Sequence, residues 1–413
     1  MPAPIRIDPD QRFSCSQCGR CCHRFDIVVS EAEIEHYRRR DAAAWFSGGG
    51  DPFEAVPEWP ALRRIRKRAD GACGFLSHDN RCRIHEELGA SAKPLTCRLF
   101  PYAFHAAADG VVVTASFACP TIIANEGPLI SSPQSMPGID ALRREWFSTP
   151  QAGPAPLEFM KGRTMDTRTA RILRDGILAM LKQDAVDIRD NIARIAATLD
   201  DLTRPKVLAL NDADFAEYVK LTIPHAATGR DAVTRPAPSR IADLLQYGFL
   251  YLVASTRAVA RRRRQSRASL RVLRLQMLAH FHRLAPPVDG VDVVALKGGL
   301  VDINAPDIRP IVHHYLRSTF ETLGARGLPV LDEIAIACSL LNATRALAVM
   351  NATASSQPVD RQVFVAALME TSDLTHVPTG GVVSWAMRRL GGGTEAAWQL
   401  TRTPESPREH QSR

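Results

Sequence analysis

The apolar positions in the second half of the chain recur at the spacing of α-helices. Ile177 lies four residues after Leu173, and Met180 and Leu181 lie three and four residues after Ile177, which places them on one helical face. The same periodicity predicts a series of helices along this half of the chain. The stretches that show it are 172–181, 188–199, 270–284, 308–323, 331–347 and 361–370.

The first part of the chain has a more mixed pattern. Ser30–Glu33 is typical of a helix N-cap with an acidic first turn, and predicts a helix to about Arg40. The glycine-rich segment 47–52 is expected to be a loop. The β-branched run Val111–Ala115 follows a predicted turn at Asp109–Gly110 and predicts a strand.

These patterns divide the chain into a small module and a larger helical domain. We expect an irregular, Cys-rich α+β module at 1–125, a Pro-, Gly- and Ser-rich linker or wrapping segment at 126–160, and a helical domain at 161–400. A polar, disordered tail is expected at 401–413. The predicted fold class is therefore mainly α.

One uncharged run raises the question of a membrane segment. Leu244–Thr256 has no charged residue and precedes Arg261–Arg264. A span needs about 20 residues, so this run is too short and is expected to be a buried core helix. Met1–Asp8 lacks the apolar core of an export signal. We therefore expect a cytoplasmic protein with no membrane span.

Cysteine is distributed very unevenly. Eight of the nine cysteines lie in the first 119 residues, and four of them are crowded into the eight residues Cys15–Cys22. Hydrophobic packing does not require such crowding, whereas thiolates at two-residue spacing can point at one soft metal centre. In a reducing compartment clustered cysteines bind metal rather than form disulfides. Cys338, in an apolar helical run, is expected to be core packing.

The remaining cysteines stand in short motifs after the first four. The motif positions, in chain order, are Cys15, Cys18, Cys21 and Cys22; Cys73, Phe75 and Leu76; Cys82 and Ile84; and Pro94, Cys97, Arg98, Phe100 and Pro101. The order of these elements is similar to that of the CxxCxxCC cysteine-cluster family of YkgJ type, whose members are described as zinc- or iron-chelating domains. The resemblance covers about the first 120 residues.

Some members of this family carry a long, mostly helical region after the module. They include proteins similar to flagellin lysine-N-methylase, and the length and layout of this chain resemble theirs. The resemblance implies S-adenosylmethionine as a cofactor and a lysine-bearing protein as substrate. The helical half has no glycine-rich fingerprint for that cofactor, since Lys297–Gly299 and Gly391–Thr394 are expected to be turns.

The identity and number of the metal centres are open from the sequence. Eight cysteines could fill two four-thiolate sites, and sulfur coordination suits both zinc and iron–sulfur clusters. The spacing of Cys15, Cys18 and Cys21, completed by a remote Cys119–Pro120, resembles that of cubane ferredoxins and favours a 4Fe-4S cluster over zinc. The predicted metal ligands are Cys15, Cys18, Cys21, Cys22, Cys73, Cys82, Cys97 and Cys119.

Cys22 and Arg98 each have more than one interpretation. Neighbouring side chains diverge, so Cys22 is expected either to join Cys73, Cys82 and Cys97 in a second group or to remain a free thiol. Arg98 could donate to a cluster sulfur or to a substrate carboxylate, or form a structural salt bridge. Four histidines lie near the cysteines and are expected to be surface or supporting residues rather than ligands. They are His23, His78, His85 and His105.

A basic stretch lies in the helical half. No acidic residue occurs between Asp243 and Asp289, and several arginines there recur at helical spacing. A solvated helix face is one interpretation, and a docking face for an acidic protein partner or a protein substrate is another. The stretch has no motif for nucleic-acid binding. The arginines on one face are Arg257, Arg261, Arg264, Arg271 and Arg274.

Two classes of function therefore stay open. The first is a metal-binding protein whose cysteine cluster holds an iron–sulfur centre, with protein lysine N-methyltransferase as its most specific form. The second is a non-catalytic zinc or iron carrier, sensor or interaction protein. The catalytic residues are not identified by the sequence.

Overall fold

The computed structural model describes residues 4–57, 59–148, 156–182, 187–229, 233–234, 301–355, 357–373 and 394–401. The chain divides into two compact units. One unit, called here the cysteine unit, comprises Pro9–Phe104 and Ala124–Gln151. The other, called the helical unit, comprises Met1–Asp8, His105–Ile123 and Ala152–Arg413.

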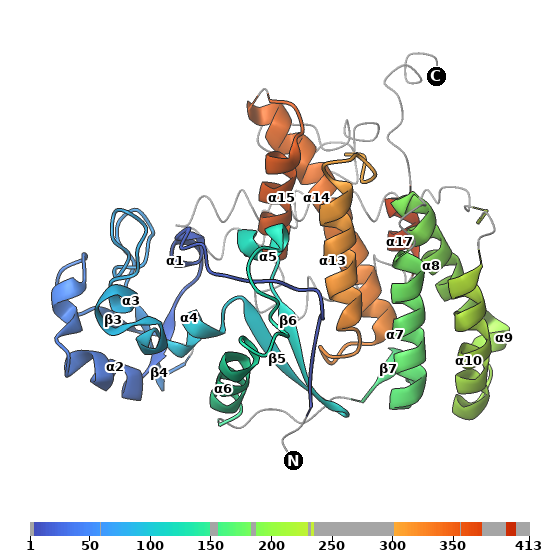
Figure 1. The fold of residues 1–413 in the computed structure, drawn as a ribbon, viewed down its shortest axis with the longest axis horizontal. Helices are drawn as coiled ribbons and strands as arrows, with labels where there is room; N and C mark the ends of the chain where they lie inside the picture. Colours follow the sequence, from blue (N-terminus) through green and yellow to red (C-terminus); the bar gives the residue numbers. More distant parts are fainter. Residues whose placement is uncertain are drawn as a thin grey trace. The chain divides into compact units, whose positions relative to one another are not determined.

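The cysteine unit is built around a small antiparallel sheet. Its strand order is β2–β4–β3, with Val28 opposite Arg64 and Phe53 opposite Ile65. Short helices accompany the sheet (Figure 1). The strands are β2 Val28–Ser30, β3 Phe53–Ala55 and β4 Leu62–Ile65, and the helices are α1 Arg20–Arg24, α2 Glu31–Arg38, α3 Arg83–Leu88, α4 Leu95–Leu99 and α6 Met136–Trp146.

Helix α2 begins as the sequence predicts and ends at Arg38. The Ser30 hydroxyl accepts a hydrogen bond from the Glu33 backbone N–H, and the Glu33 carboxylate accepts one from the Ser30 N–H. This capping box satisfies two backbone donors at the start of the helix. Glu33 also accepts a hydrogen bond from the backbone N–H of Leu95 at 2.7 Å. The same carboxylate therefore links the start of α2 to the start of α4.

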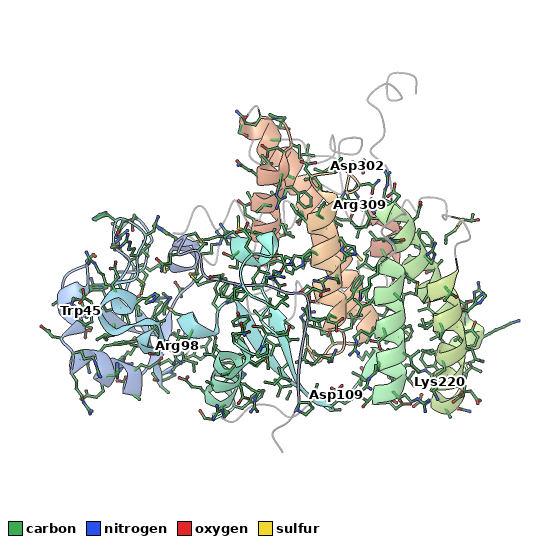
Figure 2. All side chains as sticks on the ribbon, in the orientation of Figure 1. Trp45, Arg98, Asp109, Lys220, Asp302 and Arg309 are labelled. Carbon is green, nitrogen blue, oxygen red and sulfur yellow. The ribbon has the colours of Figure 1, made fainter. Side chains whose placement is uncertain are left out.

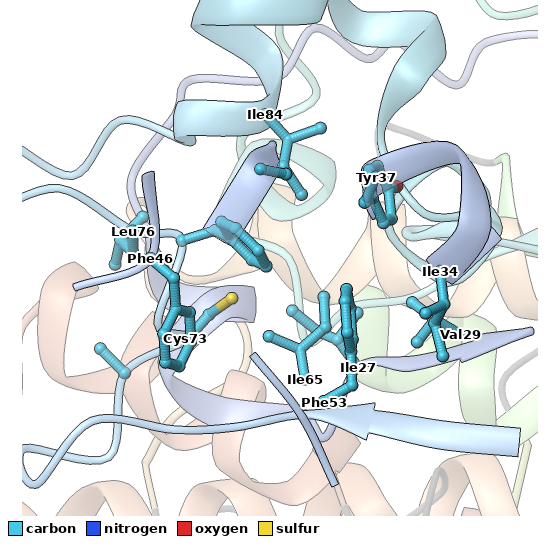
Figure 3. Packing of buried hydrophobic residues seen from close by; sticks show 13 residues of the cluster. Ile27, Val29, Ile34, Tyr37, Phe46, Phe53, Ile65, Cys73, Leu76 and Ile84 are labelled. Atoms are coloured by element: carbon cyan, nitrogen blue, oxygen red, sulfur yellow. The ribbon is translucent and has the colours of Figure 1, made fainter. Parts of the chain in front are cut away.

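The core of the cysteine unit contains one of the predicted metal ligands. Phe75 packs against both Phe46 and Phe53. The buried thiol of Cys73 lies in the same cluster as Phe46 and Phe53 (Figure 3). Cys22, Cys82 and Cys97 are partly buried and pack against this cluster. The other buried members are Ile27, Val29, Ile34, Tyr37, Ala42, Ile65, Ala72, Leu76 and Ile84.

The helical unit contains the long helices, and two of its helices approach each other very closely. Gly176 of α7 faces Ile223 of α10, and a Cβ at position 176 would lie 2.0 Å from the Ile223 Cγ2 atom. Only glycine allows this packing without movement of the helices. The helices are α5 Pro120–Ala124, α7 Thr167–Leu181, α8 Ile188–Leu202, α9 Pro205–Leu208, α10 Asp212–Thr228, α13 Arg309–Glu321, α14 Val330–Ser355, α15 Arg361–Asp373 and α17 Glu395–Leu400.

Two small sheets accompany these helices. A three-stranded sheet has the order β1–β6–β5, with β1 parallel to β6 and Ile5 opposite Val111. The predicted strand Val111–Ala115 lies within β6. A two-stranded sheet pairs β7 with β8. The strands are β1 Ile5–Ile7, β5 Tyr102–Ala107, β6 Gly110–Ala115, β7 Glu158–Met160 and β8 Arg163–Thr164.

A buried ion pair fixes the first strand of the helical unit to α13. Asp8 follows β1, and its Oδ1 accepts a hydrogen bond from Arg317 Nη1 at 2.8 Å. Both side chains are at least nine-tenths buried. Such a pair costs desolvation energy that its mutual attraction must offset, so removing one partner is far more damaging than removing both.

Helix α14 is the one described helix that is long and apolar enough to cross a membrane. In the 18-residue apolar window of this helix, within Val330–Thr353, 83% of the residues are buried inside the structure. This burial is typical of the core helix of a soluble protein. Cys338 lies in this helix and is buried, as expected for core packing.

The predicted fold class, mainly α with an α+β N-terminal module, is confirmed. The predicted helices at 172–181, 188–199, 308–323, 331–347 and 361–370 correspond to α7, α8, α13, α14 and α15. The segment 126–160, expected to be a linker or wrapping segment, includes α6. Outside the described residues lie the predicted helix at 270–284, the uncharged run Leu244–Thr256, the basic face Arg257–Arg274, the glycine group Lys297–Gly299, residues 391–393 of the other glycine group, and the tail beyond Thr401.

We predict that Asp8→Asn lowers the free energy of unfolding of the helical unit by about 3 kcal/mol, because Arg317 loses a buried carboxylate. Urea unfolding followed by circular dichroism measures the change. The matched control is Glu217→Gln in α10, which removes an exposed partner of Lys220 and should change the stability by less than about 0.5 kcal/mol. Equal effects of the two variants would contradict this role of Asp8.

Candidate metal centre

The structure places the eight predicted ligands in two different units. Seven of them belong to the cysteine unit, whereas Cys119 lies in the helical unit, directly before α5. None of the nine cysteines of the chain forms a disulfide. Cys15 and Cys18 are exposed, Cys73 and Cys119 are buried, and Cys21, Cys22, Cys82 and Cys97 are half-buried.

The loop that carries the first cysteines has an unusual backbone. Gln17 and Gly19 both have a left-handed conformation, with φ of 55° and 70°. Glycine adopts this conformation at little cost, whereas the Cβ of Gln17 makes it unfavourable there. A Cβ at Gly19 would also lie 2.8 Å from the Asn80 side-chain oxygen. Gly19 therefore allows both the turn and the close approach of Asn80. It lies directly before α1, which carries Cys21 and Cys22.

Backbone pairing brings Cys73 to α1 and Cys82 to Cys73. The Cys73 N–H donates to the Cys22 carbonyl at 2.9 Å, so these two residues lie side by side. Isolated β-bridges pair Lys67 with Cys73 and Leu76 with Cys82. Cys82 thereby returns to the neighbourhood of Cys73 and stands at the N-cap of α3.

The last cysteine of the unit is positioned by contacts of α4. The Thr96 hydroxyl donates to the Val28 carbonyl at 2.9 Å, and Glu33 accepts from the Leu95 N–H. Cys97 follows these two attachments and packs on the core. The helix is too short to be stable by itself, so its position depends on these bonds.

The thiols interact electrostatically with one another. A hydrogen bond with the Cys22 thiol lowers the pKa of Cys21 to about 6, and the same bond raises the pKa of Cys22. Burial raises the pKa of Cys73 to about 11 and holds the pKa of Cys97 well above its ordinary value. For Cys73 and Cys97, negative charge on the neighbouring thiols acts in the same direction. Several thiolates can coexist here only if a cation compensates their charge.

Lys93 is the basic side chain that interacts with most of these thiols. Burial alone would lower the pKa of Lys93, but Cys82, Cys97, Cys15 and Cys21 raise it above its ordinary value. One ammonium group cannot balance a set of five thiolates. Lys93 had no role in the sequence-based prediction, although its place four residues before Cys97 was an available signal.

The donor set fits a soft metal, but its sulfur atoms do not form a ready coordination site. Among the described residues, no three Cys, His, Asp or Glu side chains are arranged to hold an ion as they stand. Five thiols nevertheless lie close enough to interact electrostatically beside the core. Thiolates are the preferred ligands of zinc and of iron–sulfur clusters. The thiols in question are Cys21, Cys22, Cys73, Cys82 and Cys97.

Arg98 forms a structural salt bridge. Its guanidinium binds both oxygens of Glu145 in α6, with the Nη1–Oε2 distance at 2.6 Å, and its Nε donates to the Lys93 carbonyl at 2.8 Å. Arg98 is labelled in Figure 2. This paired geometry is the strongest that arginine makes with a carboxylate. Of the three interpretations of Arg98 from the sequence, the structure shows this one.

The histidines and aromatic residues near the cysteines have distinct surroundings. His23 and His78 are exposed and His85 is half-buried. His105 lies in β5 and is hydrogen-bonded to the Thr114 hydroxyl at 3.1 Å. The Phe100 ring packs on Phe25, with 5.0 Å between the centroids, directly after α1. This contact joins Phe100, which follows α4, to Phe25, which follows the two cysteines of α1.

Comparison with known families agrees with the chemistry of the thiols. Residues 14–120 match the family model CxxCxxCC, described as "Putative zinc- or iron-chelating domain". The matched range includes all eight N-terminal cysteines and confirms the resemblance expected from the sequence. It supports metal binding by this part of the chain, and does not distinguish zinc from an iron–sulfur cluster.

Three curated relatives from Salmonella are similar to a limited part of the chain. Lysine-N-methylase of Salmonella typhimurium is 26% identical over 132 residues, and that of Salmonella choleraesuis is 27% identical over 131 residues. The flagellar biosynthetic protein FliU of Salmonella muenchen is 28% identical over 131 residues. Each alignment covers 30% of this chain; it spans about a third of the methylases and three quarters of FliU. No solved structure matches the chain.

We predict that Arg98→Gln destabilises α4 by about 1–2 kcal/mol, because the Glu145 ion pair and the bond to the Lys93 carbonyl are both lost. Hydrogen exchange of the α4 backbone amides measures this loss. Arg81→Gln is the control, since Arg81 is exposed and its ion pairs with Asp79 and Glu86 lie at the surface. Unchanged exchange in Arg98→Gln would show that the ion pair does not hold α4.

Proposed function

We propose that this chain is a metal-binding protein whose cysteine unit holds an iron–sulfur centre. The observation that carries the proposal is the convergence of five thiols from four segments beside one small core. Lys93 is the main cation of the chain beside these thiols. A metal centre that replaces their protons also compensates the negative charge of the thiolates and so relieves their mutual repulsion.

Two features support a cluster over zinc. A structural zinc knuckle takes two cysteines from one turn, whereas the segment Cys15–Cys22 carries four. The left-handed residues Gln17 and Gly19 lie beside Cys18, and left-handed residues are typical of backbone turns that present amide groups to an anionic centre. The residues that would hold one centre are Cys22, Cys73, Cys82 and Cys97, and those assigned to a second centre are Cys15, Cys18 and Cys21. The role of Cys119 as a further ligand stays a prediction from the sequence.

Cys22 is assigned to the centre with Cys73, Cys82 and Cys97, because its carbonyl accepts a hydrogen bond from the Cys73 N–H and its thiol interacts with Cys73 and Cys97. When bound, an iron–sulfur centre supplies electron transfer or structural cross-linking. The chain's own contribution is to hold the thiols, to place Lys93 beside them, and to pack Phe25 and Phe100 next to α1.

We predict that anaerobically purified protein contains iron and acid-labile sulfide in equal amounts, and that Cys73→Ser loses about half or more of both, since one of two centres loses a ligand. Elemental analysis and a sulfide assay measure the content. Cys338→Ser is the matched control, because Cys338 is also buried but lies in the helical unit. Zinc without sulfide in the unmodified protein would overturn the cluster and favour the zinc carrier or sensor. Full metal content in Cys73→Ser would remove Cys73 from the ligands.

A second candidate function is protein lysine N-methylation. It is favoured by the two relatives named lysine-N-methylase and by the large helical unit, which metal binding alone does not require. In this form the chain uses S-adenosylmethionine and acts on a lysine-bearing protein.

We predict that the full chain binds S-adenosylmethionine, measured by isothermal titration calorimetry, and transfers labelled methyl groups to lysines of a flagellin-like protein. The same two measurements on Cys73→Ser, which should have a lower metal content, show whether S-adenosylmethionine binding and methyl transfer each need the metal centre. Absence of both binding and transfer in metal-replete protein would remove the enzyme and leave the metal-binding function, which the metal analysis tests separately.

A further inference from the structure

A small pocket in the helical unit is lined by three arginines. It lies between β1, the β5–β6 turn, the first turns of α7 and the loop after α13, and Figure 2 labels Asp109 of the β5–β6 turn. Its cavity volume is about 30 Å³. The lining residues that carry the argument are Arg6, Asp109, Arg171 and Arg174.

Arg6 enters the pocket with part of its guanidinium unsatisfied. Its Nη1 donates to the Glu321 carbonyl at 2.8 Å, whereas its Nε is buried and has no hydrogen-bond partner among the described residues. Leaving a buried donor of a charged group unsatisfied is costly, because the group has lost its water without a replacement. Burial lowers the pKa of Arg6, and the positive charge of Arg174 lowers it further.

The other two arginines approach from successive turns of α7. Arg174 binds the neighbouring Asp175 carboxylate, with 2.9 Å between Nη2 and Oδ1. Arg171 is an exposed residue at the pocket, and the described part of the chain offers it no ion-pair partner. Of the charged residues that line the pocket, three are arginines and one, Asp109, is acidic.

Nearby carboxylates compensate this charge only in part. Glu321 interacts electrostatically with Arg6 and Arg174, but burial raises the pKa of its carboxyl, so its own charge is disfavoured. Glu333 accepts hydrogen bonds from the Gly324 and Arg326 backbones. Neither Glu321 nor Glu333 lines the pocket, and neither bonds to the Arg6 Nε.

We propose that this pocket binds a small oxyanion, either a carboxylate group or a phosphate, between Arg6, Arg171 and Arg174. A volume of about 30 Å³ accommodates two or three water-sized groups, so the two oxygens of a carboxylate, or two oxygens of a phosphate, fit and a nucleotide does not. The oxyanion binds the guanidinium groups that line the pocket and separates their like charges. Arginine is the side chain best suited to such planar, paired recognition. The site is in the helical unit and does not depend on the metal centre.

The test is a thermal-shift and calorimetric titration of the full chain at constant ionic strength. The probes are inorganic phosphate, the peptide acetyl-Gly-Glu-Gly-amide, and its Gln counterpart, with chloride as the reference salt. We expect saturable binding of phosphate or of the Glu peptide, and no binding of the Gln peptide. Saturable binding of phosphate but not of the Glu peptide would identify the bound oxyanion as phosphate. Saturable binding of the Glu peptide would identify it as a carboxylate.

The variants separate the pocket from general positive charge. Arg171→Gln should weaken binding about tenfold or more, since one charge-assisted contact is lost. Arg171→Lys should fall between the unmodified chain and Arg171→Gln, because it keeps the charge and loses the planar fork. Arg168→Gln is the control, because Arg168 lies one turn earlier in α7 and does not line the pocket. No saturable binding of either anion, or equal loss in Arg171→Gln and Arg168→Gln, would overturn the proposal.

Discussion

The crowding of thiols against a small apolar core is the interaction on which the cysteine unit depends. Cys73 is part of that core, and Cys22, Cys82 and Cys97 pack against it. Buried thiols resist ionisation, and each thiolate that does form makes its neighbours harder to ionise. A metal cation, with a higher charge than the ammonium group of Lys93, would compensate the thiolates and so favour their ionisation. Metal binding would therefore stabilise the same contacts that hold the unit together.

The sequence could predict the parts of this unit that depend on neighbouring residues. The capping box at Ser30 and Glu33 is a local pattern, and the structure has it. The second role of Glu33, as acceptor for the Leu95 N–H, joins residues 62 positions apart and has no local signal. The motifs likewise indicated which cysteines are candidate ligands, but the pairing of Cys73 with the Cys22 backbone required the fold.

The composition of segment 126–160 did not predict helix α6, which contributes a contact to the candidate metal centre. Segment 126–160 is rich in Pro, Gly and Ser, yet α6 forms within it, with Pro137 in its first turn, where proline is tolerated. Glu145 of this helix then binds Arg98, the residue after Cys97. A distant carboxylate of this kind explains why the role of Arg98 stayed open from the sequence. In the helical unit the apolar periodicity was sufficient to place α7, α8, α13, α14 and α15.

The most direct measurement of the central claim is X-ray absorption spectroscopy at the metal edge of the purified protein. The account predicts a first coordination shell made of sulfur, at about 2.3 Å from the metal. A first shell of nitrogen and oxygen alone would contradict it, because the thiols of the cysteine unit would then not be the ligands.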